Sequence, residues 1–235
     1  MKDNKMLLSA AIIAVGMIVM GFTLRSGILG FKDHDRRVCV KGLAEREVKA
    51  DKVIWPLVYK EIGNDPALMY ENIEQKNKAL ISFLKSGGIK EDEISVNSPT
   101  ITDRQADNYG NEIMNYRYKA KSVITVTSSD VDRVRSLMCR QSELMKTGIA
   151  VTGDEYGENR VDYQFTGLNQ IKPEMVEEAT KNARATAEKF AEDSGSKLGR
   201  IFSASQGQFS IDDRDANTPY IKKIRVVNTV EYSLE

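Results

Sequence analysis

Apolar residues recur every three or four positions through residues 172–195, which predicts an amphipathic helix. Its apolar face comprises Val176, Ala179, Ala183, Ala187 and Phe190. Pro173 suits the first helical position, where its missing N–H costs nothing, and Gly195 suits the left-handed residue that ends a helix. Because most of this face is alanine, we expect the helix to lie very close to the surface it packs on.

Alternation of apolar and polar residues with a period of two predicts seven strands along the rest of the chain. They cover residues 37–48, 53–62, 94–102, 113–127, 161–168, 200–211 and 221–234. Gly42 is expected to bend the first strand, and Pro56 indicates that the second strand is an edge or carries a bulge.

Two further helices have recognisable start and stop signals. One begins at Asn64-Asp65-Pro66 and ends at Gly87-Gly88, and its apolar face comprises Met69, Ile73, Leu80 and Leu84. The other covers residues 130–146 after the capping pair Ser129-Asp130. Its predicted inner stripe comprises Val131, Val134, Met138 and Met145.

The element order repeats as strand, helix, strand, strand. One β-α-β-β half covers about residues 53–127 and the other about 161–234, and helix 130–146 joins them. Helices on one face of antiparallel sheets define an α+β fold, here expected as one domain over residues 37–235.

The N-terminal region predicts a membrane segment. Residues 6–24 form an uncharged run of 19 residues, which spans roughly 28 Å as a helix and approaches the thickness of a bilayer core. Residues 1–5 form a short flank and residues 25–36 a linker. The run is too long for a typical signal core, so we interpret it as a retained anchor, with a cleaved signal as the alternative. Basic residues lie on both sides, and their count argues against export of the folded part.

Composition narrows the possible partners. The formal net charge is zero, and without residues 1–32 the remainder carries 30 basic and 33 acidic residues. That balance argues against nucleic acid as a partner. Cys39 and Cys139 are the two cysteines, one in a strand pattern and one in a helix pattern, and we interpret both as buried free thiols.

No catalytic, cofactor-binding or metal-binding residue can be assigned. The single histidine, His34, lies in the linker, which removes histidine-dependent hydrolase designs and histidine metal sites. Asp213, Asp215 and Asn217 have the spacing of a calcium loop, but Thr218 and Ile224 stand where that loop needs glycine and glutamate. A polar hairpin loop is the better interpretation.

Three basic residues, Arg117, Lys119 and Lys121, alternate on one face of a predicted strand. We expect an exposed or edge face that discourages aggregation between sheets, with contact to an acidic partner strand as the alternative. Several tyrosines gather in the same strand-rich region: Tyr109, Tyr116, Tyr118, Tyr156 and Tyr163. They are typical of half-buried strands.

A family resemblance rests on these residues. The segment from Gly167-Leu-Asn through Ala183-Arg-Ala to Gly195-Ser-Lys-Leu-Gly199-Arg-Ile resembles the signature of the SIMPL domain family, a former domain of unknown function. Val40-Lys-Gly42, residues 89–96 and residues 115–134 are similar to its other segments. The resemblance covers roughly residues 37–234. It implies an exported bacterial envelope protein without an established catalytic set, and some relatives form large rings or are linked to oxidative stress.

The chain departs from the family pattern at two places. It keeps an anchor-length apolar run in place of a clean cleavable signal, and Lys49-Ala-Asp51-Lys stands where Pro-Asp is usual after the first strand. We therefore expect a non-catalytic, self-associating module held in the inner membrane with its folded part in the periplasm. The alternatives are a carboxylate-dependent envelope enzyme, for instance with Asp154 and Glu155, and a ring-forming channel.

Overall fold

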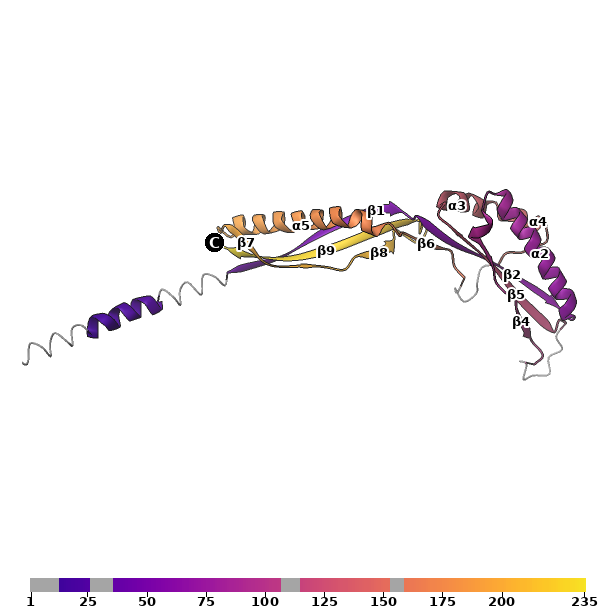
Figure 1. Cartoon of the computed structure of the whole chain (residues 1–235), viewed down its shortest axis with the longest axis horizontal. Coiled ribbons are helices and arrows are strands. Elements are labelled where there is room, and N and C mark those ends of the chain that lie inside the picture. Colours follow the sequence, from indigo (N-terminus) through magenta and orange to yellow (C-terminus); the bar gives the residue numbers. More distant parts are fainter. Residues whose placement is uncertain (1–12, 26–35, 107–114, 153–158) are drawn as a thin grey trace, which may run out of the picture. The chain divides into compact units, whose positions relative to one another are not determined.

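The computed structural model describes residues 13–25, 36–106, 115–152 and 159–235. The fold is α+β, with two antiparallel sheets and helices packed on them (Figure 1). Two compact units divide the chain. Unit 1 comprises Met1–Arg46, Ile171–Ser210 and Ile224–Glu235, and unit 2 comprises Glu47–Gln170 and Ile211–Lys223.

Unit 1 is built on the sheet with strand order β1-β9-β7. These strands are β1 (Arg37–Lys49), β9 (Ile221–Leu234) and β7 (Leu198–Gln206), and the short strand β8 (Ser210–Asp213) also pairs with β9. Helix α5 (Leu168–Asp193) runs along this sheet (Figure 1). The long strand expected at 200–211 is therefore interrupted, since residues 207–209 belong to neither β7 nor β8.

The alanine ridge of α5 contacts the sheet, as the sequence predicted. Its buried face comprises Met175, Ala179, Ala183, Ala187 and Ala191. Gly42 lies beneath it, and a Cβ atom there would stand 1.9 Å from the carbonyl oxygen of Ala179 and 2.4 Å from the nitrogen of Ala183. The expected bend at Gly42 is wrong, because β1 continues through it; glycine is needed here for the close approach of two backbones.

Helix α5 differs from its prediction at both ends of the apolar face. Phe190 is 56% exposed, whereas Met175 and Ala191 are buried. The helix also begins before Pro173, at Leu168. The carboxylate of Asp51 accepts hydrogen bonds from the N–H groups of Thr166 (2.8 Å) and Gly167 (2.9 Å), and this long-range cap starts the helix early. Gly195, with φ +67°, follows the helix as expected.

Strand β9 carries the alternation that the sequence predicted. Its buried apolar residues are Ile224, Val226, Val230 and Tyr232. The same face also buries Asn228, whose Nδ2 donates to the carbonyl oxygen of Val176 (3.2 Å) and to Oγ1 of Thr180 (3.0 Å). These two bonds tie the middle of α5 to the sheet.

Unit 2 contains the other sheet, with strand order β3-β5-β2-β6 and β4 also paired with β5. Its strands are β2 (Lys52–Gly63), β3 (Ile94–Val96), β4 (Thr100–Asp103), β5 (Tyr118–Ser128) and β6 (Asp162–Gln164). The strand predicted at 94–102 is split between β3 and β4, on either side of a connection that contains Pro99. Proline lacks an N–H donor and cannot take part fully in a ladder. The inward face of β5 buries Ala120, Ser122, Ile124 and Val126, as alternation predicted.

The helices of unit 2 are α2 (Pro66–Ser86), α3 (Val131–Cys139) and α4 (Ser142–Lys146). In α2 the predicted cap and apolar face are confirmed, and Asp65 accepts from the N–H of Ala67 at 2.9 Å. The single helix predicted over 130–146 is wrong, because the chain breaks between α3 and α4. Leu137 completes the buried stripe within α3, and after the break Leu144 is buried whereas Met145 is 68% exposed.

The first strand expected for the C-terminal half is also wrong. Residues 161–168 supply only β6, which pairs with β2 in unit 2. In unit 1 the corresponding position is held by β1, so the order β1-β9-β7 matches the order β2-β5-β3. Alternation along a strand identifies its buried face but not its partner, which explains the error.

The N-terminal residues 13–25 form a helix. Its large apolar side chains are 53–67% exposed, from Ile13 through Leu24. Within the described ranges, no helix is both long and apolar enough to cross a membrane. The predicted segment 6–24 lies partly outside those ranges.

The contact between Gly42 and α5 gives a testable prediction. Gly42→Ala should lower the free energy of unfolding by about 1–3 kcal/mol, because the methyl group would overlap backbone atoms that cannot move independently. Urea unfolding measures the change. Lys41→Ala, at an exposed neighbouring position, is the matched control and should change stability by less than about 0.5 kcal/mol. Equal effects of the two substitutions would contradict the close approach.

Candidate functional site

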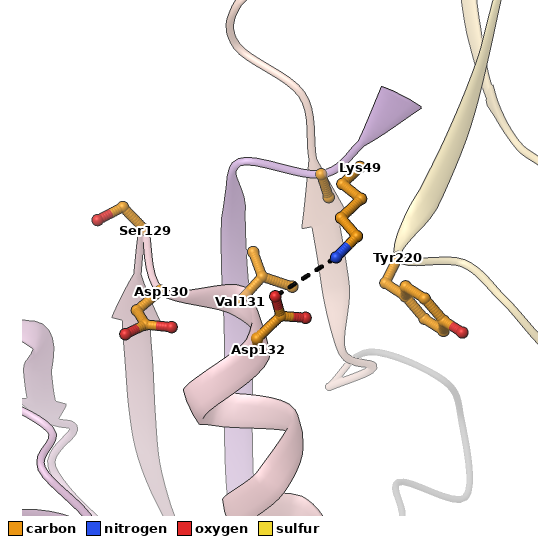
Figure 2. A pocket seen from close by; sticks show the side chains of 7 residues that line it. Lys49, Ser129, Asp130, Val131, Asp132 and Tyr220 are labelled. Atoms are coloured by element: carbon orange, nitrogen blue, oxygen red, sulfur yellow. Dashed lines mark ion pairs between the residues drawn. The ribbon is translucent and has the colours of Figure 1, made fainter. Parts of the chain in front are cut away.

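A hollow of about 320 Å³ lies at the start of α3 in unit 2 (Figure 2). It is lined by Lys49, Ala50, Ser129, Asp130, Val131, Asp132 and Tyr220. Figure 2 shows the carboxylates of Asp130 and Asp132 on the first turn of α3, with Tyr220 on the other side of Lys49. The hollow is therefore polar, with charges of both signs.

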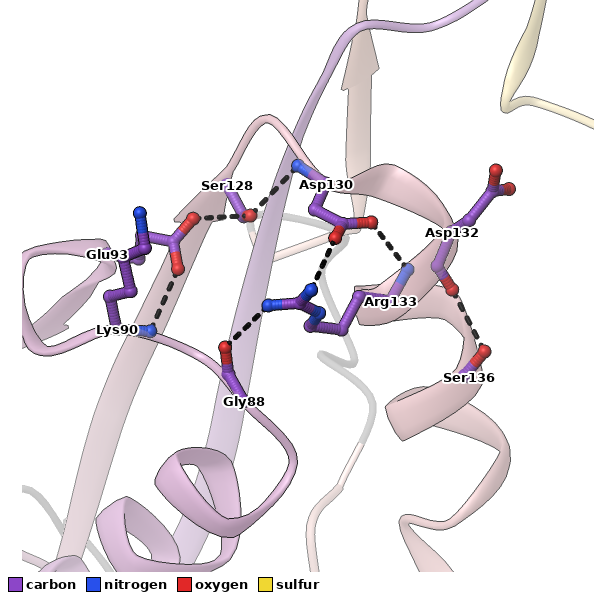
Figure 3. Close-up of polar contacts among 8 residues, drawn as sticks. All are labelled: Gly88, Lys90, Glu93, Ser128, Asp130, Asp132, Arg133 and Ser136. Carbon is purple, nitrogen blue, oxygen red and sulfur yellow. Dashed lines mark hydrogen bonds and ion pairs between the residues drawn. The ribbon is translucent and has the colours of Figure 1, made fainter.

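A hydrogen-bonded network fixes the acidic side of this hollow (Figure 3). Oγ of Ser128 donates to Glu93 at 2.6 Å and accepts from the N–H of Asp130 at 3.1 Å. Asp130 in turn accepts from the N–H of Arg133 at 3.0 Å and forms an ion pair with its guanidinium at 3.1 Å. Arg133 also donates to the carbonyl oxygen of Gly88 at 2.9 Å. Asp130 is thus a helix cap held in place from two sides.

The hydrogen bond from Ser128 lowers the pKa of Glu93 below its usual value, and the bond from the N–H of Lys90 acts in the same direction. Burial opposes both. A carboxyl with a lowered pKa is ionised at neutral pH and cannot serve as a general acid. Glu93 consequently acts as an acceptor that anchors the start of α3.

Tyr220 is the aromatic residue that lines the hollow. The guanidinium of Arg135 lies 3.4 Å from the centre of the Tyr220 ring. The rings of Tyr220 and Tyr163 meet edge to face, with centres 6.2 Å apart. Burial raises the pKa of Tyr163, which keeps its hydroxyl protonated. Tyr220 is therefore held by a cation on one side and a ring on the other.

Lys49 is the most loosely held residue of the hollow. Its Nζ lies 3.6 Å from Oδ2 of Asp132, and both side chains are largely exposed, at 74% and 68%. Ion pairs of this kind contribute about 0–1 kcal/mol in water, so Lys49 can exchange Asp132 for another anionic partner. The hollow can therefore bind a polar group, while its acids are already engaged in the fold.

The predicted basic stripe lies on β5 and just before it. Arg117 forms a fork with Asp103, with Nη2 to Oδ2 at 2.7 Å, and this contact lowers the pKa of Asp103. Lys119 stands opposite Ile62 and Thr102, and Lys121 stands opposite Lys60 and Thr100. The stripe therefore lies on the sheet face opposite the buried one, and its strand β5 is not an edge strand, since it has partners on both sides.

The residues spaced like a calcium loop lie at the hairpin between β8 and β9, where Asp215 accepts hydrogen bonds from backbone groups of the same loop. Asp215 accepts from the N–H groups of Asn217 and Thr218, both at 2.8 Å, and from the Thr218 hydroxyl. The Thr218 hydroxyl, followed by Arg214, lowers the pKa of Asp215 to about 2. Asp213 forms an ion pair with Lys222. In the part of the chain that the structure covers, no group of three or more His, Cys, Asp or Glu residues could hold a metal.

The expectation that both cysteines are buried is wrong. Cys39 and Cys139 are both exposed and neither is in a disulfide, so they are not buried thiols. Among the clustered tyrosines, Tyr116 is 45% exposed and Tyr163 is 8% exposed, so they do not share one environment. His34, Asp154, Glu155, Tyr109 and Tyr156 lie outside the described residues.

Sequence reasoning missed a buried polar cluster under α2. The hydroxyl of Tyr59 donates to Oδ1 of Asn77 at 2.8 Å and to the carbonyl oxygen of Ile73 at 3.0 Å. Ser122 also donates to Oδ1 of Asn77 at 3.3 Å. Burial raises the pKa of Tyr59. The available signal was Ser122 itself, a polar residue at an inward position of an alternating strand.

A second hollow of about 320 Å³ lies above this cluster, between α2 and the β3–β4 connection. Its lining includes Tyr70, Asn77, Ile81, Val96 and Pro99. No pattern in the sequence indicates this hollow, because the hollow depends on where the split edge of the sheet lies beside the helix.

An α+β domain of two antiparallel sheets, with its acids engaged in caps and ion pairs, defines the class of protein. The SIMPL family, described as a protein of unknown function (DUF541), matches residues 38–232. The chain belongs to this family, and the suspected resemblance is confirmed. A search of curated proteins finds no match.

The Asp215 loop gives a prediction with a defined pH dependence. Because the pKa of Asp215 falls from 3.8 to about 2 on folding, its ionised form stabilises the fold at neutral pH. That contribution is lost as pH falls through about 2. Thr218→Val removes the principal cause, so the variant should be less stable at pH 7 and approach the parent between about pH 4 and pH 2.

Urea unfolding midpoints measured across this pH range test the prediction. Thr218→Ser keeps the hydroxyl and is the matched control, expected to follow the parent at each pH. A stability difference for Thr218→Val that does not change with pH would show that the hydroxyl acts without its effect on Asp215.

Proposed function

We propose that this chain is a non-catalytic interaction module of the cell envelope, tethered to the inner membrane and associating with copies of itself. One observation carries the proposal. The acid at the centre of the hollow has structural partners, because Asp130 caps α3 and pairs with Arg133, and the neighbouring Glu93 accepts from Ser128. Groups engaged in this way favour binding through surfaces over acid–base chemistry.

The direction of the carboxyl pKa shifts supports this proposal. In the described ranges, each carboxyl with a resolved shift is shifted downward: Glu93, Asp103, Glu143, Glu177 and Asp215. A general acid at neutral pH needs a shift in the opposite direction. Among the tyrosines of the described ranges, the pKa values of Tyr59 and Tyr163 are raised, and burial is the main cause of both shifts.

Tethering is supported by the N-terminal run of 19 uncharged residues and by the exposure of its apolar side chains over residues 13–24. A helix that is apolar on all sides and exposed is stabilised by insertion into lipid. Family membership favours export of the folded part to the periplasm. The basic residues that follow the run oppose that orientation, so the orientation needs its own experiment.

The outward face around Lys119 is the proposed interaction surface. Lys119 and Lys121 lie on this face, and Lys60 stands opposite Lys121 in the register. Arg117 contributes mainly by holding Asp103 at the end of β4. A cationic sheet face of this kind fits an acidic segment of a partner protein.

The exposed cysteines make the orientation testable. Variants that retain only Cys139 or only Cys39 should react with a membrane-impermeant maleimide in intact cells as completely as after permeabilisation. A variant with both cysteines replaced by serine is the control for specificity. Labelling that occurs only after lysis would place the folded part in the cytoplasm and contradict the envelope role.

Self-association has a direct measurement. The full chain, extracted in mild detergent, should have a protein mass that is a multiple of the single-chain mass by light scattering with detergent correction. The fraction of the larger species should rise with concentration, because association follows mass action. A strict monomer across the concentration range, with no co-purifying partner, would contradict the proposed function.

A further inference from the structure

Strand β7 is an outer strand of the sheet in unit 1. It pairs with β9 on one side, and no other described strand pairs with its opposite side. The residues from Arg200 to Gln206 are all exposed. Two of them are large and apolar: Ile201 is 55% exposed and Phe202 is 58% exposed.

The two outer strands of this sheet differ in charge. β1 carries charged residues throughout its length: Arg37, Lys41, Glu45, Arg46, Glu47 and Lys49. β7 carries one, Arg200, and the stretch from Ile201 to Gln206 is uncharged. Natural edge strands commonly carry charges that prevent pairing with other chains. In this sheet β1 has that protection and the C-terminal part of β7 lacks it.

The uncharged part of β7 is geometrically regular. Ser203, Ala204, Ser205 and Gln206 pair in unbroken register with β9, whereas register shifts occur on the N-terminal side of Ser203. Phe202 sits at the boundary, with the guanidinium of Arg37 3.4 Å from the centre of its ring. A regular stretch of small residues permits close approach of another strand, and a positioned aromatic ring can cover its end.

We propose that two copies of this chain pair antiparallel along β7, about a two-fold axis at Ala204. This inference rests on the self-association proposed above and assigns it to one surface. The pairing continues the sheet of one copy into the sheet of the other. It places Ser203 opposite Ser205 of the second copy and Phe202 opposite Gln206.

The charges of β7 favour pairing with the β7 of a second copy over pairing with the β1 edge of that copy. In this register Arg200 stands opposite Gln208, so no like charges meet across the axis. Pairing of β7 with the β1 edge of another copy would place an uncharged strand beside six charged residues. An isologous contact also closes after two copies, which avoids open-ended polymers.

A lysine on the pairing strand should disrupt the dimer. Ser205→Lys places two ammonium groups close to the axis and should raise the dimer dissociation constant at least about tenfold, measured on the full chain in detergent by sedimentation. The matched control is Ser95→Lys, at an exposed position of an outer strand in unit 2, and it should leave dissociation unchanged.

Cross-linking tests the register itself. In a chain with Cys39→Ser and Cys139→Ser, Ala204→Cys should form a disulfide-linked dimer on mild oxidation. Directly opposed residues in an antiparallel pair have Cβ atoms about 4.5–5.5 Å apart, within reach of a bond after a small shift. Ser95→Cys in the same background should remain monomeric under denaturing conditions.

The outcomes distinguish this inference from the proposed function. Loss of association in Ser205→Lys together with cross-linking at Ala204→Cys supports pairing along β7. Association that survives Ser205→Lys, without cross-linking at position 204, overturns the inference and leaves self-association standing. A monomeric parent overturns both. If the parent is a monomer that carries a different bound protein, and Ser205→Lys loses that protein, then β7 binds another protein and not a second copy.

Discussion

The close approach of α5 to the sheet of unit 1 is the constraint on which that unit depends. Four alanines of α5 and Gly42 of β1 leave so little side-chain volume that two backbones come into contact. Such packing buries little apolar area for each residue, so the polar anchors matter more. Within unit 1 one such anchor is Asn228, which binds the middle of the helix at the carbonyl oxygen of Val176 and at Oγ1 of Thr180.

Unit 2 is stabilised in a different way. Its core contains large side chains such as Trp55, Leu57 and Ile124, packed under α2 and α3. Polar residues enter it only where they are paired, as Tyr59, Asn77 and Ser122 are. Polar groups are likewise paired beside the hollow at α3. Ser128 donates a hydrogen bond to Glu93 and accepts one from the N–H of Asp130. Helix capping therefore already occupies Asp130, which accepts from the N–H of Arg133 and pairs with its guanidinium.

Two exposed surfaces of the sheets remain without a described partner strand or helix. The lysine-bearing face of β5 and the uncharged outer strand β7 lie in different units, and each has a chemistry suited to another polypeptide. In this member of a family of unknown function, that distribution is the physical basis of the interactions proposed above. The proposed tether would confine copies to two dimensions and raise their effective concentration, which would populate even a small strand-to-strand contact.

The amino-acid sequence by itself determined the local structure: the cap and stripe of α2, the alanine ridge of α5 and the inward faces of β5 and β9. These follow from the periods of helix and strand and from side-chain size, which act over a few residues. Tertiary structure alone decided that β1 completes unit 1, that α3 and α4 are separate, that Gly42 serves a contact and that both cysteines are exposed. Each of these depends on which distant segments meet, and alternation in one segment carries no information about its partner.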